Sequence, residues 1–326
     1  MATLYLDRSG LELREEGESL AIYESGRKRR SVPLLLLERI VIQGNVQLGS
    51  RLLARLSARN VGLIVIDRRR GEAAAATTWL AGGDARRRLA QYRAYFDEAW
   101  RRNWSRRLMR HKLAAQRALL LGAAEERPVQ RHALRSAAQT LAQLLERLRH
   151  EPALELASIR GIEGAAAAAY FSAYAGLFAP ALGFEDRNRR PPRDPVNACL
   201  SLGYTLAHHQ ACCAVAAAGL DPAIGFYHDL AHGRESLACD LVELLRPRVE
   251  AWVWRLFRER KLRAEHFRKH AGACLLGKAG RAVFYEEYEL WSARWARQQR
   301  RICRLLVRAL TGEDPGGSLE DAAAVS

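Results

Sequence analysis

The hydrophobic periodicity of the chain changes once, near residue 85, and this change limits the folds that the sequence can adopt. Before it, short apolar runs such as TLYLD (3–7), LELRE (11–15) and VGLIVID (61–67) are separated by turn residues. After it, apolar residues recur at spacings of three and four. The first pattern is typical of short strands and the second of amphipathic helices. We therefore expect an α+β fold, with a small N-terminal β-sandwich followed by an all-α domain.

The change in pattern also predicts where the elements and the domains lie. We place the boundary after residue 80, giving a domain over 1–80 and a helical domain over 81–326. The segment GFEDRNRRPPRDP (183–195) carries adjacent prolines and several charges, which indicates an exposed loop. The expected strands are 3–7, 11–15, 19–25, 40–44, 61–67 and 71–80, with a short helix at 50–60, and the expected helices begin at 86 and cover 130–149, 154–178, 196–219, 236–257 and 280–310.

The balance of charge indicates a polyanionic partner. Lys and Arg total 52 against 36 Asp and Glu, which gives a net charge of +16. Hydrophobic residues make up 49% of the chain, so a disordered basic chain is excluded. Arginine clusters alternate with Tyr92, Trp100 and Trp104, a combination suited to phosphate contacts and base stacking. The alternative is a basic face that is merely solvated.

Several classes of protein do not fit the sequence. An apolar run of 18 or more residues is absent, and the N-terminus MATLYLDRSG lacks the pattern of a secretory signal. The six cysteines include no C-x-x-C pair, so we expect no structural zinc site and reduced thiols in a cytoplasmic protein. Neither a phosphate-binding G-x-x-x-x-G-K-[ST] loop nor a G-x-S-x-G motif is present.

The first candidate for chemistry is Glu163, in the segment SIRGIEGAAAAAYF (158–171). The small residues around it, including Gly161 and Gly164, leave room for a ligand to approach the carboxylate. The alternative is an acid near a helix N-terminus, stabilised by the helix dipole.

The second candidate is the segment GFYHDLAHGRESLACDLVELLRP (225–247). His228 lies in an expected loop, and Asp240 and Glu243 share one face of the helix that follows. Together with Glu163 they offer a mixed nitrogen and oxygen site that suits Mn²⁺ or Mg²⁺. The alternative is that Glu243 pairs with a nearby arginine and His228 is a packed loop residue. The remaining histidines are interpreted as solvated or packing residues: His111, His132, His150, His208, His209, His232, His266 and His270.

These segments, taken together, resemble the CRISPR spacer-acquisition integrases, the larger of the two core adaptation proteins (the "Cas-one" family). The stretches that carry the resemblance are IRGIEGAAAAAYF (159–171), RNRRPPRDPVNACLSLGYTLA (187–207), GFYHDLAHGRESLACDLVELLRP (225–247) and GKAGRAVFYEEYE (277–289). The N-terminal LYLDRSGLEL fits as well. Cys239 and Leu244 depart from the residues usual in the family, but neither replaces a ligand.

The resemblance implies a metal-dependent endonuclease and integrase of double-stranded DNA. It implies that Glu163, His228 and Glu243 are metal ligands for Mn²⁺ or Mg²⁺, with Asp240 as a supporting acid. It also implies a homodimer formed through the sandwich and a heterohexameric complex with the small partner adaptation protein ("Cas-two"). From their charge and loop position, we expect Arg187, Arg189, Arg190 and Arg193 to contact DNA near the metal.

Two other functions compete with this interpretation. A non-enzymatic nucleic-acid binder would use the same basic surface, with the acids forming surface ion pairs only. A basic peripheral membrane protein would need a lipidation motif or a basic amphipathic helix, and the sequence shows neither. Dependence of a covalent change in DNA on a divalent ion separates the first interpretation from the second.

Overall fold

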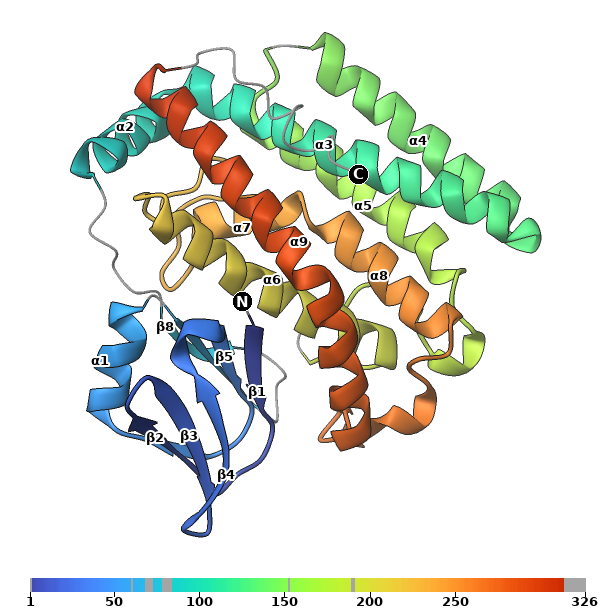
Figure 1. The fold of residues 1–326 in the computed structure, drawn as a ribbon. Helices are drawn as coiled ribbons and strands as arrows, with labels where there is room; N and C mark the ends of the chain where they lie inside the picture. The colour runs from blue at the N-terminus through green and yellow to red at the C-terminus, as the bar shows by residue number, and fades with distance from the viewer. Residues whose placement is uncertain are drawn as a thin grey trace.

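A computed structural model describes residues 2–59, 61–67, 73–77, 84–151, 153–188 and 191–313. Its N-terminal part contains two four-stranded sheets and one helix, below the helical region in Figure 1. The predicted α+β fold is confirmed, whereas the boundary expected at residue 80 lies outside the described residues. The elements of this part are β1 (Ala2–Leu6), β2 (Leu11–Glu16), β3 (Ser19–Glu24), β4 (Arg27–Pro33), η1 (Leu34–Leu36), β5 (Leu37–Ile42), β6 (Val46–Leu48), α1 (Ser50–Ala58), β7 (Gly62–Ile66) and β8 (Ala73–Thr77).

The two sheets enclose a small apolar core of their own. One has the order β1-β5-β7-β8 and the other β4-β3-β2-β6. Strands β1, β5 and β7 are parallel, with Leu4 opposite Ile40 and Ile40 opposite Leu63. Leu20, Ile40 and Leu56 are fully buried in the core that the sheets share with α1. This burial gives the sandwich its own source of stability.

The helical region forms the larger part of the molecule. Helix α3 packs against both α4 and α5, and α9 crosses in front of α6, which it contacts (Figure 1). Trp295, Tyr170 and Tyr174 are among its largest fully buried side chains. Its elements are α2 (Ala85–Phe96), α3 (Glu98–Glu126), η2 (Pro128–Gln130), α4 (Arg131–His150), α5 (Leu156–Ala175), η3 (Pro180–Leu182), α6 (Pro195–Ala217), α7 (Ser236–Glu243), α8 (Arg246–Arg258), η4 (Ala264–His266), β9 (Phe267–His270), β10 (Ala273–Leu276) and α9 (Lys278–Thr311).

Two of the expected helices are each divided in two. The helix expected over 236–257 ends at Glu243 and resumes at Arg246, because Pro247 lacks an amide hydrogen and its ring would clash with the carbonyl of Glu243. The helix expected from residue 86 breaks at Asp97, whose side chain accepts a hydrogen bond from the amide of Trp100 (3.0 Å) and caps α3.

Four strand segments were not expected from the sequence, namely β4, β6, β9 and β10. β4 pairs with β3 through a turn at Ser25 and Gly26, where both residues have positive φ. β9 and β10 form a second hairpin, so the helical region is not all-α, and its turn at Ala271 and Gly272 also has positive φ at both residues. Short turns of this kind match the twist of paired strands.

Helix α9 fastens the sandwich to the helical region. Tyr5 in β1 donates a hydrogen bond to Glu289 (2.7 Å), and its ring stacks on Tyr285 at 4.1 Å between centroids. Tyr285 in turn donates to Gln43 (2.9 Å). Throughout the described segments, every helix is too short or too polar to cross a membrane.

Candidate active site

Three helices bring a buried lysine and two carboxylates together. The Nζ atom of Lys112 in α3 lies 2.6 Å from Oε1 of Glu163 in α5 and 2.7 Å from Oε2 of Glu243 in α7. The side chains of Lys112 and Glu243 are 6% and 5% exposed, and that of Glu163 is 29% exposed. Two acids separated by 80 positions in the sequence therefore converge on a single cationic atom.

The position of Glu163 argues against a role in capping its helix. α5 begins at Leu156, so Glu163 lies two turns into the helix. The helix dipole acts mainly within the first turn, so it does not account for the acid at this position. The side chain instead points to the junction with α3 and α7, as the bond from Lys112 shows.

Glu243 remains ionised although it is buried. Burial opposes its charge, but Arg246 and Lys112 outweigh that cost and hold the pKa of Glu243 well below its usual value. The Nε atom of Arg246 lies 2.7 Å from Oε1 of Glu243, so the arginine pairing considered from the sequence is present. The pKa of Lys112 is raised, because the attraction of Glu243 and Glu163 exceeds the effect of burial.

Asp240 orients His228 and the loop that carries it. The carboxylate of Asp240 is fully buried and accepts hydrogen bonds from the backbone amides of Phe226 (2.7 Å), Tyr227 (3.0 Å) and His228 (3.0 Å). Its Oδ1 atom also lies 2.8 Å from Nδ1 of His228. A carboxylate acceptor places the proton of the imidazole on Nδ1, which leaves the lone pair on Nε2 for a ligand.

Two arginines hold the same loop from the other side. Arg160 in α5 donates to the carbonyl oxygen of Tyr227 (2.9 Å) and pairs with Asp229 (2.7 Å). Arg101 in α3 donates to the carbonyl oxygen of Phe226 (3.1 Å) and also pairs with Asp229 (3.1 Å). His228 is therefore fixed relative to the helices that carry Glu163 and Lys112.

The donor set of this cluster suits a hard divalent cation. Glu163, Glu243 and His228 supply two carboxylates and one imidazole, the ligand types that Mn²⁺ accepts. Among the described residues, however, the three ligand atoms do not all lie within 4.8 Å of one another. The ammonium of Lys112 bonds both carboxylates where they converge. It therefore occupies the position between them, which explains why the three side chains are not closer together.

Lys112 was missed in the sequence, although a signal was present. The buried residues of α3 include Leu108, Met109, Leu113 and Gln116, and Lys112 lies on the same stripe. A lysine on an apolar helix face has to find a carboxylate partner, because an unpaired buried charge is costly.

The four arginines expected to contact DNA have different surroundings. Arg187 is directed inward and donates to Oδ1 of Asn197 (2.7 Å) and Oγ of Ser201 (3.1 Å) in α6. Arg193 is exposed. Arg189 and Arg190 lie outside the described residues. The loop is less exposed than expected, since Phe184 and Asp194 are buried.

Comparison with known proteins places this chain in a family. The sequence profile described as "CRISPR associated protein Cas1" matches residues 4–290. The chain belongs to the Cas1 family. It is 36% identical over 306 residues to the CRISPR-associated endonuclease Cas1 1 of Thermodesulfovibrio yellowstonii, covering 93% of this chain and 94% of the relative. It is 32% identical over 333 residues to the CRISPR-associated endonuclease Cas1 3 of Thermus thermophilus, covering 97% and 96%.

Solved structures show the same Cas1 fold. A Cas1 protein from Thermotoga maritima superposes with a TM-score of 0.83 at 23% identity, covering 96% of this chain and 97% of that chain. A casposase bound to its integration product superposes with a TM-score of 0.80 at 21% identity, covering 96% and 91%. The family predicted from the sequence motifs is therefore confirmed, as is the arrangement of N-terminal sheets before a largely helical region.

Proposed function

We propose that this Cas1 protein is a metal-dependent DNA endonuclease and integrase that transfers the 3′-hydroxyl ends of captured DNA to the edges of CRISPR repeats. The observation that carries the proposal is the convergence of Glu163 and Glu243 on Lys112, beside the imidazole that Asp240 orients. Buried acids held in this way are costly to maintain, and such costs are typical of functional sites.

Mn²⁺ or Mg²⁺ would be held by the carboxylates of Glu163 and Glu243 and by Nε2 of His228. When bound, such an ion polarises the scissile phosphate and stabilises charge on the entering or leaving oxygen. Asp240 keeps His228 in the tautomer that offers Nε2. Lys112 holds the two carboxylates together and would give up its contact with at least one of them as they turn to a ligand.

The reaction exchanges one phosphodiester bond for another. The oxygen of a DNA 3′-hydroxyl forms a bond to phosphorus, and its proton passes to water. The bond from that phosphorus to the 3′-oxygen of the target strand breaks, and the leaving oxygen takes up a proton. Because the bonds formed and broken are of one kind, the step needs no nucleotide cofactor.

Basic side chains on the β9–β10 hairpin and around the cleft that it lines support binding to double-stranded DNA. The carbonyl oxygen of Pro192 in the arginine loop accepts a hydrogen bond from the amide of Cys274 (2.7 Å), so this loop rests on the β9–β10 hairpin. The hairpin carries the exposed residues Arg268, Lys269 and His270. They line a cleft of about 700 Å³ that also includes Arg8, Lys278, Arg281 and one acid, Asp7, which lies 3.6 Å from Arg281. Cations in such an arrangement suit a phosphate backbone.

The proposed assembly is a homodimer that joins a small Cas2 partner in a heterohexamer. A Cas6-RT-Cas1–Cas2 complex contains a chain of this fold, with a TM-score of 0.82 at 20% identity over 97% of this chain and 36% of that chain. Leu35 and Leu36, at the edge of the sandwich, are 77% and 54% exposed and offer apolar area to a second copy. Sedimentation should show a dimer at micromolar concentration, and a monomer would contradict this assembly.

A branched DNA substrate tests the proposed reaction. A labelled strand junction carrying a flap is incubated with Mn²⁺ or Mg²⁺, and the products are separated on a denaturing gel. We expect a resealed, longer strand together with the released flap, because the transfer is nearly isoenergetic and reversible. A 3′-deoxy end is the matched control, since it removes the nucleophile and keeps the binding surface. Shortened fragments alone would reveal a nuclease, and DNA binding without any covalent change would reveal a non-enzymatic binder.

A further inference from the structure

Helix α6 carries two consecutive pairs of histidine and cysteine, each separated by one helical turn. Nδ1 of His208 lies 3.8 Å from Sγ of Cys212, and Nδ1 of His209 lies 3.9 Å from Sγ of Cys213. A spacing of four residues places both side chains of a pair on the same face of the helix. The two pairs are almost identical in local geometry, so their surroundings decide what each can bind.

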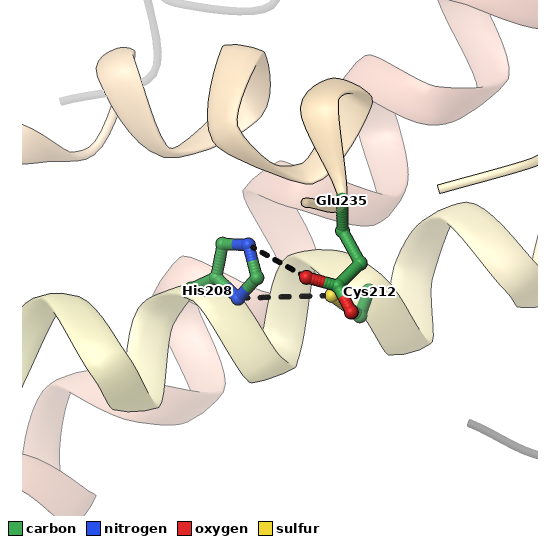
Figure 2. A group of neighbouring side chains, drawn as sticks. All are labelled: His208, Cys212 and Glu235. Carbon is green, nitrogen blue, oxygen red and sulfur yellow. Dashed lines mark hydrogen bonds and ion pairs between the residues drawn. The ribbon is translucent and has the colours of Figure 1, made fainter. Parts of the chain in front are cut away.

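The first pair faces a carboxylate at the start of the next helix. Nε2 of His208 lies 3.9 Å from Oε2 of Glu235, the residue that precedes α7 (Figure 2). One ligand atom from each of His208, Cys212 and Glu235 lies within 4.8 Å of the other two. Figure 2 shows the imidazole of His208 and the thiol of Cys212, both from α6, directed toward the carboxylate of Glu235, which lies just before α7.

The second pair faces the sandwich and a positive charge. Gly62 in β7 packs closely on it, because a Cβ atom there would lie 3.0 Å from the His209 ring and 3.4 Å from Sγ of Cys213. The buried guanidinium of Arg39 acts on the Cys213 thiol and partly offsets the rise in its pKa that burial causes. The positive charge of Arg39 would repel a metal ion beside His209 and Cys213. This pair therefore serves as an internal control for metal binding at His208 and Cys212.

We propose that His208, Cys212 and Glu235 form a second metal site, which binds Zn²⁺. Thiolate, imidazole and carboxylate are the three ligand types found at protein zinc sites, whereas Mg²⁺ and Mn²⁺ disfavour thiolate. Cys212 is buried, while the side chains of His208 and Glu235 are 31% and 50% exposed. Water can therefore reach the open side and supply the fourth ligand of a tetrahedral site.

The protonation states of the ligands agree with this geometry. Burial lowers the pKa of His208, which keeps the imidazole neutral and able to donate a lone pair. Burial raises the pKa of the Cys212 thiol, so binding of the ion releases a proton from sulfur. The absence of a C-x-x-C pair does not argue against the site, because its ligands come from α6 and from the residue before α7, which only the fold brings together.

The site links α6 to the first residue before α7, the helix that carries Asp240 and Glu243. The backbone carbonyl of Glu235 also accepts the amide hydrogen of Cys239 (2.9 Å) in the first turn of that helix. Arg246, which pairs with Glu243 in the proposed catalytic cluster, is among the charged groups that lower the pKa of His208. A bound ion would thus fix the start of α7 and help to position the acids at its far end.

Titration with Co²⁺ tests this site directly, since cobalt bound by a thiolate has a sulfur-to-metal charge-transfer band in the near ultraviolet. The full-length protein is freed of metal and reduced with a phosphine. We expect a band that saturates at one thiolate-bound Co²⁺ per chain and disappears when Zn²⁺ is added. The matched variants are Cys212→Ala, which should abolish the band, and Cys213→Ala, which should leave it unchanged. Glu163→Gln should also leave it unchanged, which separates this site from the proposed catalytic one.

The exposed residue Glu235 gives a second, independent variant that does not disturb the core. Glu235→Gln should weaken Co²⁺ binding at least tenfold in the same titration, with the secondary structure unchanged by circular dichroism. Absence of the band in the wild-type protein would overturn the proposal. A band that survives Cys212→Ala, or that Cys213→Ala removes equally, would overturn it as well.

Discussion

The β-sandwich and the helical region place their charged side chains differently. In the sandwich, pairs such as Arg14–Glu12 and Lys28–Glu16 lie at the surface. Within its described part, Arg39 is the charged residue that is buried, and it faces Glu289 of α9 at 3.7 Å. The described part of the helical region buries a larger set of charged residues, namely Lys112, Asp194, Asp240, Glu243, Glu250, Arg281 and Glu287.

The two regions therefore differ in how much stability depends on their charged side chains. Surface ion pairs contribute about 0–1 kcal/mol each, so the sandwich would lose little without them. Removing one partner of a buried pair costs about 3–5 kcal/mol, because the other charge remains buried. In the helical region this larger cost applies around Lys112, where the carboxylates of Glu163 and Glu243 both contact the ammonium.

The largest effect is expected when a proposed metal ligand is replaced. At metal sites, the loss of a residue that only hydrogen-bonds a ligand costs ~10–100-fold in affinity or activity. Glu163→Gln or His228→Asn removes a proposed ligand itself, so strand transfer should fall by more than this. The fold and the affinity for DNA should be retained, as measured by circular dichroism and fluorescence anisotropy. Glu15→Gln, which disrupts ion pairs with Arg51 and Arg55 in the sandwich, is the control and should keep wild-type turnover. Wild-type turnover of either site variant with Mn²⁺ would show that the site is misplaced.

The second effect concerns stability and compares two lysines. Lys112→Met should lower the free energy of unfolding by about 3–5 kcal/mol without divalent ions, because Glu163 and Glu243 then repel each other. Mn²⁺ should restore more stability to this variant than to the wild-type protein. Lys28→Met breaks the exposed pair with Glu16 and should cost about 0–1 kcal/mol. Chemical denaturation measures both free energies of unfolding. Equal losses for the two variants would show that the buried and the exposed ion pairs do not differ in their contribution to stability.

A smaller effect is expected at Asp240, which we place behind the proposed ligand His228. Asp240→Asn should reduce both Mn²⁺ affinity and strand transfer by about 10–100-fold, since it disturbs the tautomer and the orientation of the imidazole. Electron paramagnetic resonance of free Mn²⁺ measures the affinity separately from turnover. A complete loss of binding would promote Asp240 to a ligand, whereas unchanged Mn²⁺ affinity would reduce it to a structural role.

The sequence predicted this site only in part, for identifiable reasons. Glu163, Asp240 and Glu243 could be chosen because acids beside small or apolar residues need a partner, and His228 because it lies in the loop before the helix that carries two of them. Their partner Lys112 lies in a different helix, and pattern alone does not show which helix faces α5 and α7. The contact between His208 and Glu235 is likewise visible only when α6 and α7 are packed together.

The fold was predicted in outline, and its errors are local. The change from strands to helices near residue 85 follows from periodicity. Strand β4 was missed because its sequence RKRRSVP is almost entirely exposed and lacks alternation. The break before α8 could have been found from Pro247, and the two hairpins from glycines at their turns.

The smallest effect is expected for single surface arginines. Arg193→Ala should reduce the slope of log affinity for DNA against log salt by about one, because one phosphate contact is lost. Replacing Arg187, Arg189 and Arg190 together should flatten the slope further. Arg187→Ala alone should mainly reduce stability, since its guanidinium is bonded to Asn197 and Ser201. An unchanged slope in the triple variant would place the DNA path elsewhere.

The central claim is that the buried charges of the helical region form the binding site of the catalytic ion. Anomalous diffraction at the manganese absorption edge, from crystals of the full-length protein grown with Mn²⁺, tests it most directly. We predict a peak in contact with Glu163, Glu243 and Nε2 of His228, with the ammonium of Lys112 withdrawn from at least one carboxylate. A clear anomalous map without a peak at these three residues, in a protein that still performs strand transfer with Mn²⁺, would contradict the account.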